Sequence, residues 1–164
     1  KKRMKIALII ESGEPREVHH YATLLGYGAS AVNGYLVQDT IFDLIEKGLI
    51  QKDYYAAVKD YNDAMLHGII KIASKMGIST IASYRGSQIF EAIGINHDVI
   101  NKYFPNTVSR VEGISIEDIE KDVDYRHVSA YDPLGLEMDL TLESAGGHKE
   151  RSGKEEVLLL HCLV

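Results

Sequence analysis

The chain has 164 residues, 45% of them hydrophobic, and a formal net charge of −6. This length suits one ordinary domain with a hydrophobic core, and the acidic balance excludes a general nucleic-acid binder, which needs a basic face. No apolar run approaches the length of a membrane-spanning helix, and the single cysteine, Cys162, can form no internal disulfide. We therefore expect a cytoplasmic protein with neither a nucleic-acid nor a membrane partner.

The first part of the chain alternates short apolar runs with helical patterns. The run at residues 4–10 predicts a buried strand. Pro15 suits the first position of a helix that ends at residues 26–28, where two glycines stand. A second apolar segment covers residues 29–36, and Asp39 is the predicted cap of the helix that follows.

The longest predicted helix begins after Asp53, which can cap it, and closes at Gly77. Its apolar residues recur at intervals of three and four, which is the period of one buried helix face. The residues of this stripe are Val58, Tyr61, Met65, Ile69, Ile72 and Met76.

The next part of the chain predicts a third strand at residues 78–84 and a helix at residues 87–94. A short helix at residues 96–104 is stopped by a proline. A serine and an aspartate three residues apart form a capping box, which begins a helix over residues 115–130.

Alternating strands and helices predict an α/β fold, with a short, mostly parallel sheet and helices packed on it, over residues 1–131. Residues 132–164 form a separate C-terminal tail in this interpretation. Apolar and polar residues alternate in it over 134–142, as in a half-buried strand, and residues 157–164 are an apolar run. Because an unpaired apolar strand recruits another chain, we expect this tail to pair across a homodimer; the alternative is that it folds back on its own sheet.

No segment carries a convincing catalytic or metal motif. Glycines 26 and 28 follow a predicted helix, whereas a phosphate-binding loop must follow a strand and open a helix. His19 and His20 are adjacent, so on a helix their side chains point about 100° apart and cannot share one metal ion. Cys162 lies in an apolar run without a recognisable base, so it is not a predicted nucleophile.

The segment at residues 75–88 is the densest in polar residues and glycine, and it admits two interpretations. If residues 78–84 are a strand, then Tyr84, Arg85 and Gln88 stand at its carboxyl end, where ligands bind in open α/β sheets. In the alternative, Arg85 and Gln88 lock a turn or contact another domain.

Three strings in this sequence strongly resemble the large (alpha) subunit of glutamate synthase. The first runs from Ile10-Glu-Ser-Gly-Glu14 through Arg16-Glu-Val-His-His20 to Leu25-Gly-Tyr-Gly28. The second is Lys75-Met-Gly-Ile-Ser-Thr80 with Ser83-Tyr-Arg-Gly86 and Gln88-Ile-Phe-Glu-Ala-Ile-Gly94, and the third runs from Phe104-Pro to Ser109-Arg-Val-Glu-Gly113. Together they cover about residues 5 to 127.

The resemblance implies an oxidoreductase of glutamate biosynthesis and nitrogen assimilation. Enzymes of this family convert glutamine and 2-oxoglutarate into two glutamates. An amino-terminal cysteine glutaminase domain releases ammonia, which crosses a tunnel to a barrel domain with FMN and a 3Fe-4S cluster. The matching strings correspond to the late central domain and the lead-in to the FMN-binding domain.

The resemblance also implies that this chain alone is inactive and holds no cofactor of its own. It begins at Lys1 rather than a catalytic cysteine, and its single cysteine cannot ligate a cluster. Gly34 stands where the family usually has proline. The likeness thins after residue 147, so we expect a fragment, a truncated reading frame or a split gene.

Two functions follow as expectations. The first is a non-catalytic interdomain piece, whose partners are the other domains of glutamate synthase and which helps to pack them around the ammonia path. The alternative is a stand-alone module that binds a small metabolite. The candidate interdomain or ligand-contact residues are Arg16, His19, His20, Lys75, Ser79, Tyr84, Arg85 and Gln88.

Overall fold

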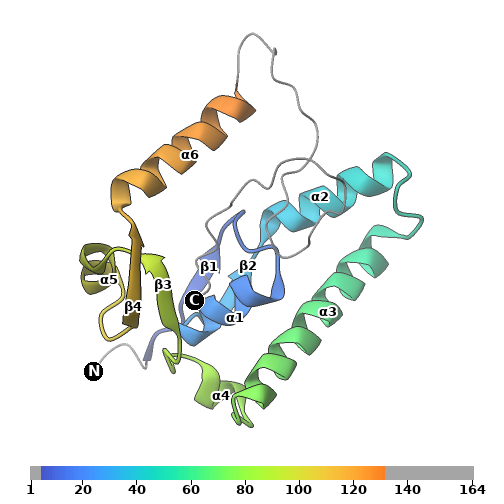
Figure 1. The fold of residues 1–164 in the computed structure, drawn as a ribbon. Coiled ribbons are helices and arrows are strands. Elements are labelled where there is room, and N and C mark those ends of the chain that lie inside the picture. Colours follow the sequence, from blue (N-terminus) through green and yellow to red (C-terminus); the bar gives the residue numbers. More distant parts are fainter. Residues whose placement is uncertain (1–4, 132–164) are drawn as a thin grey trace, which may run out of the picture. The chain divides into compact units, whose positions relative to one another are not determined.

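A computed structural model describes residues 5–131, and the following account is confined to them. The chain divides into two compact units between Ile89 and Phe90. Each unit contains helices and a two-stranded parallel sheet, so the predicted α/β class is confirmed (Figure 1). The predicted tail strands at 134–142 and 157–164, and the dimer that depends on them, lie outside the described residues. The predicted boundary after residue 131 stays a prediction.

The first unit opens with a strand–helix–strand arrangement (Figure 1). Strand β1, Ile9–Glu11, pairs in parallel with β2, Ala31–Asn33, and helix α1, Val18–Gly26, connects them. The pairing aligns Ile9 with Ala31 and Glu11 with Asn33. Parallel pairing requires such a crossover, because the chain must return to the starting end of the sheet.

Three further helices complete the first unit: α2, Tyr35–Glu46; α3, Tyr54–Lys75; and α4, Ile81–Tyr84. Helix α3 packs against both α1 and α2. A Cβ built on Gly68 of α3 would lie 2.5 Å from both methyl carbons of Val18. The absence of a side chain at Gly68 therefore allows α1 and α3 to approach closely.

The prediction of the longest helix is confirmed. The Asp53 carboxylate accepts hydrogen bonds from the backbone N–H groups of Tyr55 and Ala56, at 3.1 and 3.3 Å. Gly77 follows the helix with a φ of +71°, a left-handed conformation that favours glycine. Ile69, in the middle of the apolar stripe, is buried, whereas Met76 at its end is exposed.

The second unit repeats the strand–helix–strand arrangement. Strand β3, Glu91–Ile95, pairs in parallel with β4, Val108–Ile114, across helix α5, His97–Tyr103. Helix α6, Ile116–Ala130, follows β4. The core of this unit consists of one apolar cluster from β3 and α5, with Ile114 of β4 packed against it: Ala92, Ile95, Val99 and Ile100.

The predicted starts of both helices in this unit are confirmed. The Asn96 side chain accepts from the Asp98 N–H at 2.8 Å, which caps α5. Ser115 and Asp118 form the predicted capping box, in which the Ser115 N–H donates to the Asp118 carboxylate at 3.0 Å. These local hydrogen bonds also hold the pKa of Asp118 below its usual value.

Two predictions between residues 78 and 94 are wrong. Residues 78–84 form no strand; the Thr80 hydroxyl instead accepts from the Ser83 N–H and caps α4. Residues 87–94 form no helix, because Gly86 and Gln88 both have positive φ, at 75° and 50°, which a right-handed helix cannot contain. The segment from Glu91 is β3 instead, and β4 was not predicted at all.

Three predictions in the first unit need correction. Strand β1 begins at Ile9 and is largely exposed rather than buried. Helix α1 begins at Val18, three residues after Pro15. Asp39 does not cap α2 but lies inside it, because the helix starts directly after β2 with Gly34 at its N-cap.

Within residues 5–131, no helix combines the length and apolar character that crossing a bilayer demands.

Candidate functional site

The candidate histidines lie at the start of α1, and His20 has a local structural role there. Its Nδ1 accepts hydrogen bonds from the backbone N–H groups of Arg16 and Glu17, at 3.2 and 3.3 Å. The side chain thus closes the first turn of the helix as a capping residue does. His19 is exposed, and its carbonyl oxygen accepts a 2.7 Å hydrogen bond from the Thr23 hydroxyl. The described part of the chain contains no group of three or more potential metal ligands.

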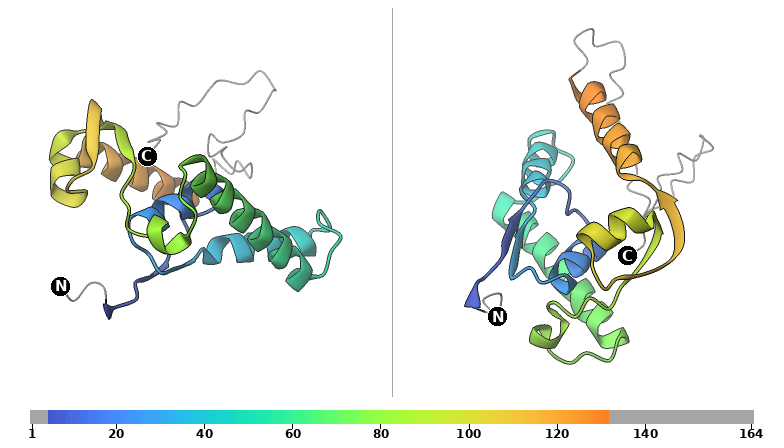
Figure 2. Two further views of the ribbon diagram at one scale, coloured as in Figure 1. Left: turned by 90° about the horizontal axis from the view of Figure 1, so that it is seen from below. Right: turned by 90° about the vertical axis from the view of Figure 1, so that its left-hand side faces the viewer.

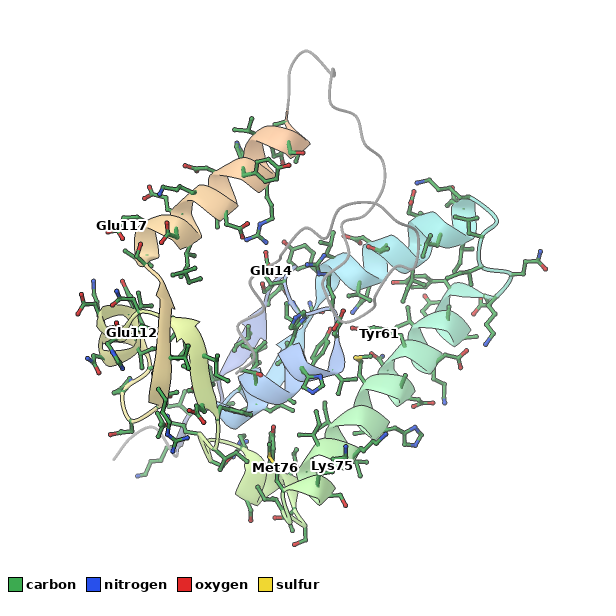
Figure 3. The ribbon with its side chains drawn as sticks, in the orientation of Figure 1. Glu14, Tyr61, Lys75, Met76, Glu112 and Glu117 are labelled. Atoms are coloured by element: carbon green, nitrogen blue, oxygen red, sulfur yellow. The ribbon has the colours of Figure 1, made fainter. Side chains whose placement is uncertain are left out.

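A pair of tyrosine hydroxyls holds the segment that precedes α1. Tyr61 on α3 (Figure 3) donates to the Arg16 carbonyl oxygen at 2.9 Å. Tyr21 on α1 donates to the Pro15 carbonyl oxygen at 3.1 Å. The two hydroxyl oxygens are 3.1 Å apart, and the rings meet edge to face with centroids 6.5 Å apart. This cluster joins α1, α3 and the loop between β1 and α1.

Burial, with a contribution from the Tyr21 hydroxyl, raises the pKa of Tyr61. A general acid or base works best with a pKa near the ambient pH. Because the shift carries Tyr61 further from neutrality, this hydroxyl acts as a permanent hydrogen-bond donor. The chemistry of the cluster is structural support rather than proton transfer.

The second group of candidates lies at the other end of α1. The backbone N–H of Gly86 donates to the Leu25 carbonyl at 3.1 Å, and that of Gln88 donates to the Gly26 carbonyl at 3.1 Å. Carbonyl groups in the last turn of a helix lack partners within the helix. The segment after α4 therefore supplies them, which agrees with the interpretation in which this segment locks a turn.

The side chains of this segment differ in their exposure. Tyr84 is fully buried, and burial raises the pKa of its hydroxyl. Arg85 is exposed, and its Nη1 lies 3.4 Å from the Ser30 hydroxyl oxygen, which also accepts from the Leu8 N–H at 3.2 Å. Since residues 78–84 are not a strand, the crevice expected at a strand end is absent from this place.

The candidate residues do not form one site. Arg16, His19 and His20 lie at the start of α1, and the Tyr84–Gln88 segment contacts its end. A helix of 9 residues is about 14 Å long, so these two groups are separated by its length. Lys75 is exposed at the end of α3 (Figure 3). Ser79 is also exposed and follows this helix in the chain.

The loop of glycines 26 and 28 ends α1, as predicted. Tyr27 is the C-cap, and the Gly28 N–H donates to the Leu25 carbonyl at 2.9 Å. Gly28 has a φ of 108°, which favours glycine. The N–H groups of Tyr27 and Gly28 thus bond back to the helix, instead of pointing at a phosphate.

The second unit holds an exposed polar cluster that the sequence analysis did not find. His97 at the start of α5 contacts the Glu112 carboxylate on β4 through Nδ1, and its Nε2 lies 3.1 Å from the Ser109 carbonyl oxygen (Figure 3). Arg110 pairs with Glu91 across the two strands at 2.9 Å. These contacts depend on the register of β3 and β4, and β4 had no recognised strand signal.

Polar groups in the described residues thus serve helix ends, turns and strand pairs. The elements that they join form an α/β segment, and comparison with known proteins gives its family. The family model "Glutamate synthase central domain" matches residues 1–96. The chain belongs to this family, and the resemblance found in its sequence is confirmed.

Several curated relatives are similar over most of this chain. The large chain of the NADPH glutamate synthase of Bacillus subtilis is 45% identical over 153 residues, which are 93% of this chain and 10% of the relative. The NADH glutamate synthase of Schizosaccharomyces pombe is 42% identical over 95% of this chain and 8% of its own length. Ferredoxin-dependent glutamate synthase 2 of Synechocystis is 38% identical, over 93% and 10% respectively. The chain therefore spans about a tenth of the length of these relatives.

Proposed function

We propose that this chain is a non-catalytic structural piece of a glutamate synthase, which packs between the other domains and helps to wall the path of ammonia. The observation that carries the proposal is that few large apolar side chains are buried and many are exposed. Tyr84 is the one large side chain that is fully buried among the described residues. Large apolar side chains are exposed in both units, among them Ile9 at 70%, Leu49 at 71% and Val128 at 65%. Such surface marks sites of contact with other protein segments.

The comparison of relatives supports a role that does not depend on the electron donor. The names of the similar proteins specify NADPH, NADH or ferredoxin. Because the same segment recurs with 38% to 45% identity beside all three donors, its task belongs to the part of the reaction that these enzymes share. Packing around the path of ammonia would be a task that all three kinds of enzyme share.

The residues of this chain do not fit the 3Fe-4S cluster of the family. Such a cluster needs several thiolates, and the full sequence contains one cysteine. FMN, the cluster and the glutaminase cysteine therefore belong, in this proposal, to other parts of a cytoplasmic enzyme. In the same proposal, residues beyond 96, where the match to the central-domain family ends, lead into the FMN-binding domain.

Assays of the purified chain test this proposal. We expect a colourless protein with neither glutaminase nor glutamate synthase activity. A flavin absorption band that stays with the chain through gel filtration, or turnover of glutamine, would contradict it. Calorimetry with glutamate, 2-oxoglutarate and FMN addresses the metabolite-binding alternative. We expect no binding heat, because Tyr84 is buried whereas Arg85 and Gln88 are exposed.

A further inference from the structure

Strand β2 passes directly into helix α2 in the first unit (Figure 2). The junction is Asn33-Gly34, the one Asn-Gly pair in the sequence. A glycine after asparagine favours attack of its backbone nitrogen on the asparagine side-chain amide, because no Cβ blocks the approach. A Cβ on Gly34 would lie 2.3 Å from the Tyr21 hydroxyl oxygen and 2.8 Å from the Pro15 carbonyl oxygen. The packing around this junction therefore favours glycine, and with it a chemically labile pair.

The peptide unit between Asn33 and Gly34 leaves its nitrogen available for this attack. The Asn33 carbonyl accepts from the Ser12 N–H at 3.1 Å, so it points toward β1. In a trans peptide unit the N–H lies opposite the carbonyl, and the Gly34 N–H therefore points away from β1. Within residues 5–131, no group accepts a hydrogen bond from this N–H. The Gly34 nitrogen can thus lose its proton to solvent when the junction opens.

The Asn33 side chain, which must receive the attack, is held at both ends of its amide. Its Nδ2 donates to the Glu11 carboxylate of β1 at 3.0 Å, and its Oδ1 accepts from the Gln38 amide of α2 at 3.3 Å. The side chain can turn freely toward the Gly34 nitrogen only after these hydrogen bonds break. Since Gly34 is also buried, the reaction requires a local opening of the junction.

We propose that Asn33 is a site of spontaneous deamidation, whose rate is set by release of its side chain from Glu11 and Gln38. The Gly34 nitrogen gives up its proton to water and bonds to Cγ of Asn33. The Cγ–Nδ2 bond breaks, and the leaving nitrogen takes up a proton and departs as ammonia. Water then opens the five-membered imide at either of its two carbonyls, which gives aspartate or isoaspartate at position 33. Water is the one co-reactant, and the chain returns to a closed set of bonds.

Either product disturbs the pairing of β1 with β2. Aspartate replaces the Nδ2 donor by a second carboxylate beside Glu11, so that a hydrogen bond becomes a repulsion between like charges. Isoaspartate adds one carbon to the backbone at the residue that is aligned with Glu11. Because the rise per residue in a strand is fixed, the extra carbon displaces the end of β2 from its register.

Peptide mass spectrometry of the full chain, incubated at mildly alkaline pH, tests the site. In native buffer, we expect Asn33 to be converted before any other asparagine of the chain. We also expect its conversion to be about tenfold or more slower in buffer than in a denaturing concentration of urea, because the folded junction opens only locally. Earlier conversion of another asparagine in buffer, or equal rates in buffer and urea, would overturn the proposal.

Substitutions of the two holding residues test what sets the rate. Glu11→Ala and Gln38→Ala should each accelerate conversion of Asn33 in buffer by about fivefold, the usual weight of one hydrogen bond, and leave the rate in urea unchanged. Gln51→Ala, at an exposed glutamine between α2 and α3, is the matched control and should change neither rate. Unchanged rates in buffer for both Glu11→Ala and Gln38→Ala would overturn the proposal.

Circular dichroism identifies a variant that has unfolded, whose rate in buffer then equals its rate in urea. Should Glu11→Ala fail to fold, Glu11→Gln keeps an acceptor oxygen without the charge. Its acceleration should be smaller and in the same direction, and a rate equal to that of the parent would count against the holding role of Glu11.

The structural effect of the product is tested by Asn33→Asp. We expect its melting temperature to fall several degrees below that of the parent, because the new carboxylate faces Glu11. Asn62→Asp, at an exposed residue of α3, is the matched control and should melt with the parent. Equal melting temperatures for Asn33→Asp and Asn62→Asp would overturn the proposed disturbance of the strand pair.

Discussion

Tyr21 and Gly34 share one space in the first unit. A Cβ built on Gly34 would lie 2.3 Å from the Tyr21 hydroxyl oxygen and 2.8 Å from the Pro15 carbonyl oxygen. The backbone of Gly34 is not left-handed, so the restriction is one of room rather than of conformation. The Tyr21 hydroxyl therefore occupies the room that a side chain at position 34 would need.

We expect Gly34→Ala to lower the free energy of unfolding by about 1–3 kcal/mol, the usual cost of overpacking. Tyr21→Phe removes the nearest atom, so the double variant should be more stable than the sum of the single changes predicts. Urea unfolding of the four proteins measures this coupling, for which about 0.5–3 kcal/mol is typical of residues in contact. Strict additivity would show that the hydroxyl does not fill this space.

His97 gives the second unit a pH dependence whose sign is fixed by its contacts. The hydrogen bond to the Ser109 carbonyl, and then that to the Glu112 carboxylate, raise the pKa of His97 above 6.5, and Asp98 adds to the shift. A raised pKa in the folded state means that the stabilisation is fully present below about pH 6.5. It is lost as the pH rises through the folded-state pKa.

The corresponding prediction concerns His97→Gln. We expect its stability deficit against the parent to be largest near pH 6 and to shrink as the pH increases toward 8, measured by urea unfolding at each pH. His67→Gln, at an exposed histidine of α3, is the matched control and should show no such trend. A deficit that is constant with pH would mean that the His97 ring only fills space.

Helix α3 shows which elements could be predicted from sequence. Its cap, its apolar stripe and its terminal glycine lie close together in the chain, and each carries its own signal. The same holds for α5 and α6, whose caps are local hydrogen bonds. The strands were predicted less well, because β1 and β2 have three residues each and β4 depends on a partner 17 positions before it, as in the pairing of Glu91 with Val108.

The prediction of the candidate site was limited for the same reason, because its contacts join parts of the chain that are far apart in sequence. The conformation of residues 84–88 depends on the positive φ of Gln88 and on hydrogen bonds to carbonyl groups at the end of α1. These carbonyl groups lie about 60 residues earlier in the chain. No side-chain pattern signals such a backbone contact. The sequence argued against a metal ion shared by His19 and His20, but it did not indicate that the His20 ring accepts hydrogen bonds from the Arg16 and Glu17 N–H groups.

The apolar stripe of α3 offers a matched pair of substitutions. Ile69 is 9% exposed and its neighbour Ile70 is 55% exposed, so the same change can be made on the two faces of one helix. We expect Ile69→Asp to bury an unpaired carboxylate and to cost several kcal/mol or prevent folding. Ile70→Asp should stay within about 0.5 kcal/mol of the parent, as surface changes usually do. Equal melting temperatures for both variants would refute the assignment of this face to the core.

At the largest scale, the buried apolar residues of the described part of the chain include many alanines. Within residues 5–131, five of the buried apolar residues are alanines: Ala22, Ala29, Ala57, Ala73 and Ala92. Each contributes little transfer free energy, because stabilisation grows with the apolar area removed from water. Helix α6 adds no buried residue. The elements of the α/β fold within residues 5–131 therefore bury few large apolar side chains.

This small core predicts a marginally stable isolated chain. We expect its urea unfolding to have a slope at or below the lower end of the usual range of about 1–3 kcal/mol/M, because little surface is newly exposed on unfolding. We also expect the folded chain to bind a hydrophobic dye, since large apolar side chains such as Ile9 and Tyr55, 70% and 80% exposed, are open to it. The Ile9→Ser and Tyr55→Ser double variant should bind less dye without a loss of stability. A steep, cooperative transition without dye binding would mean that the chain covers its own apolar surface, and the need for neighbouring domains would then disappear.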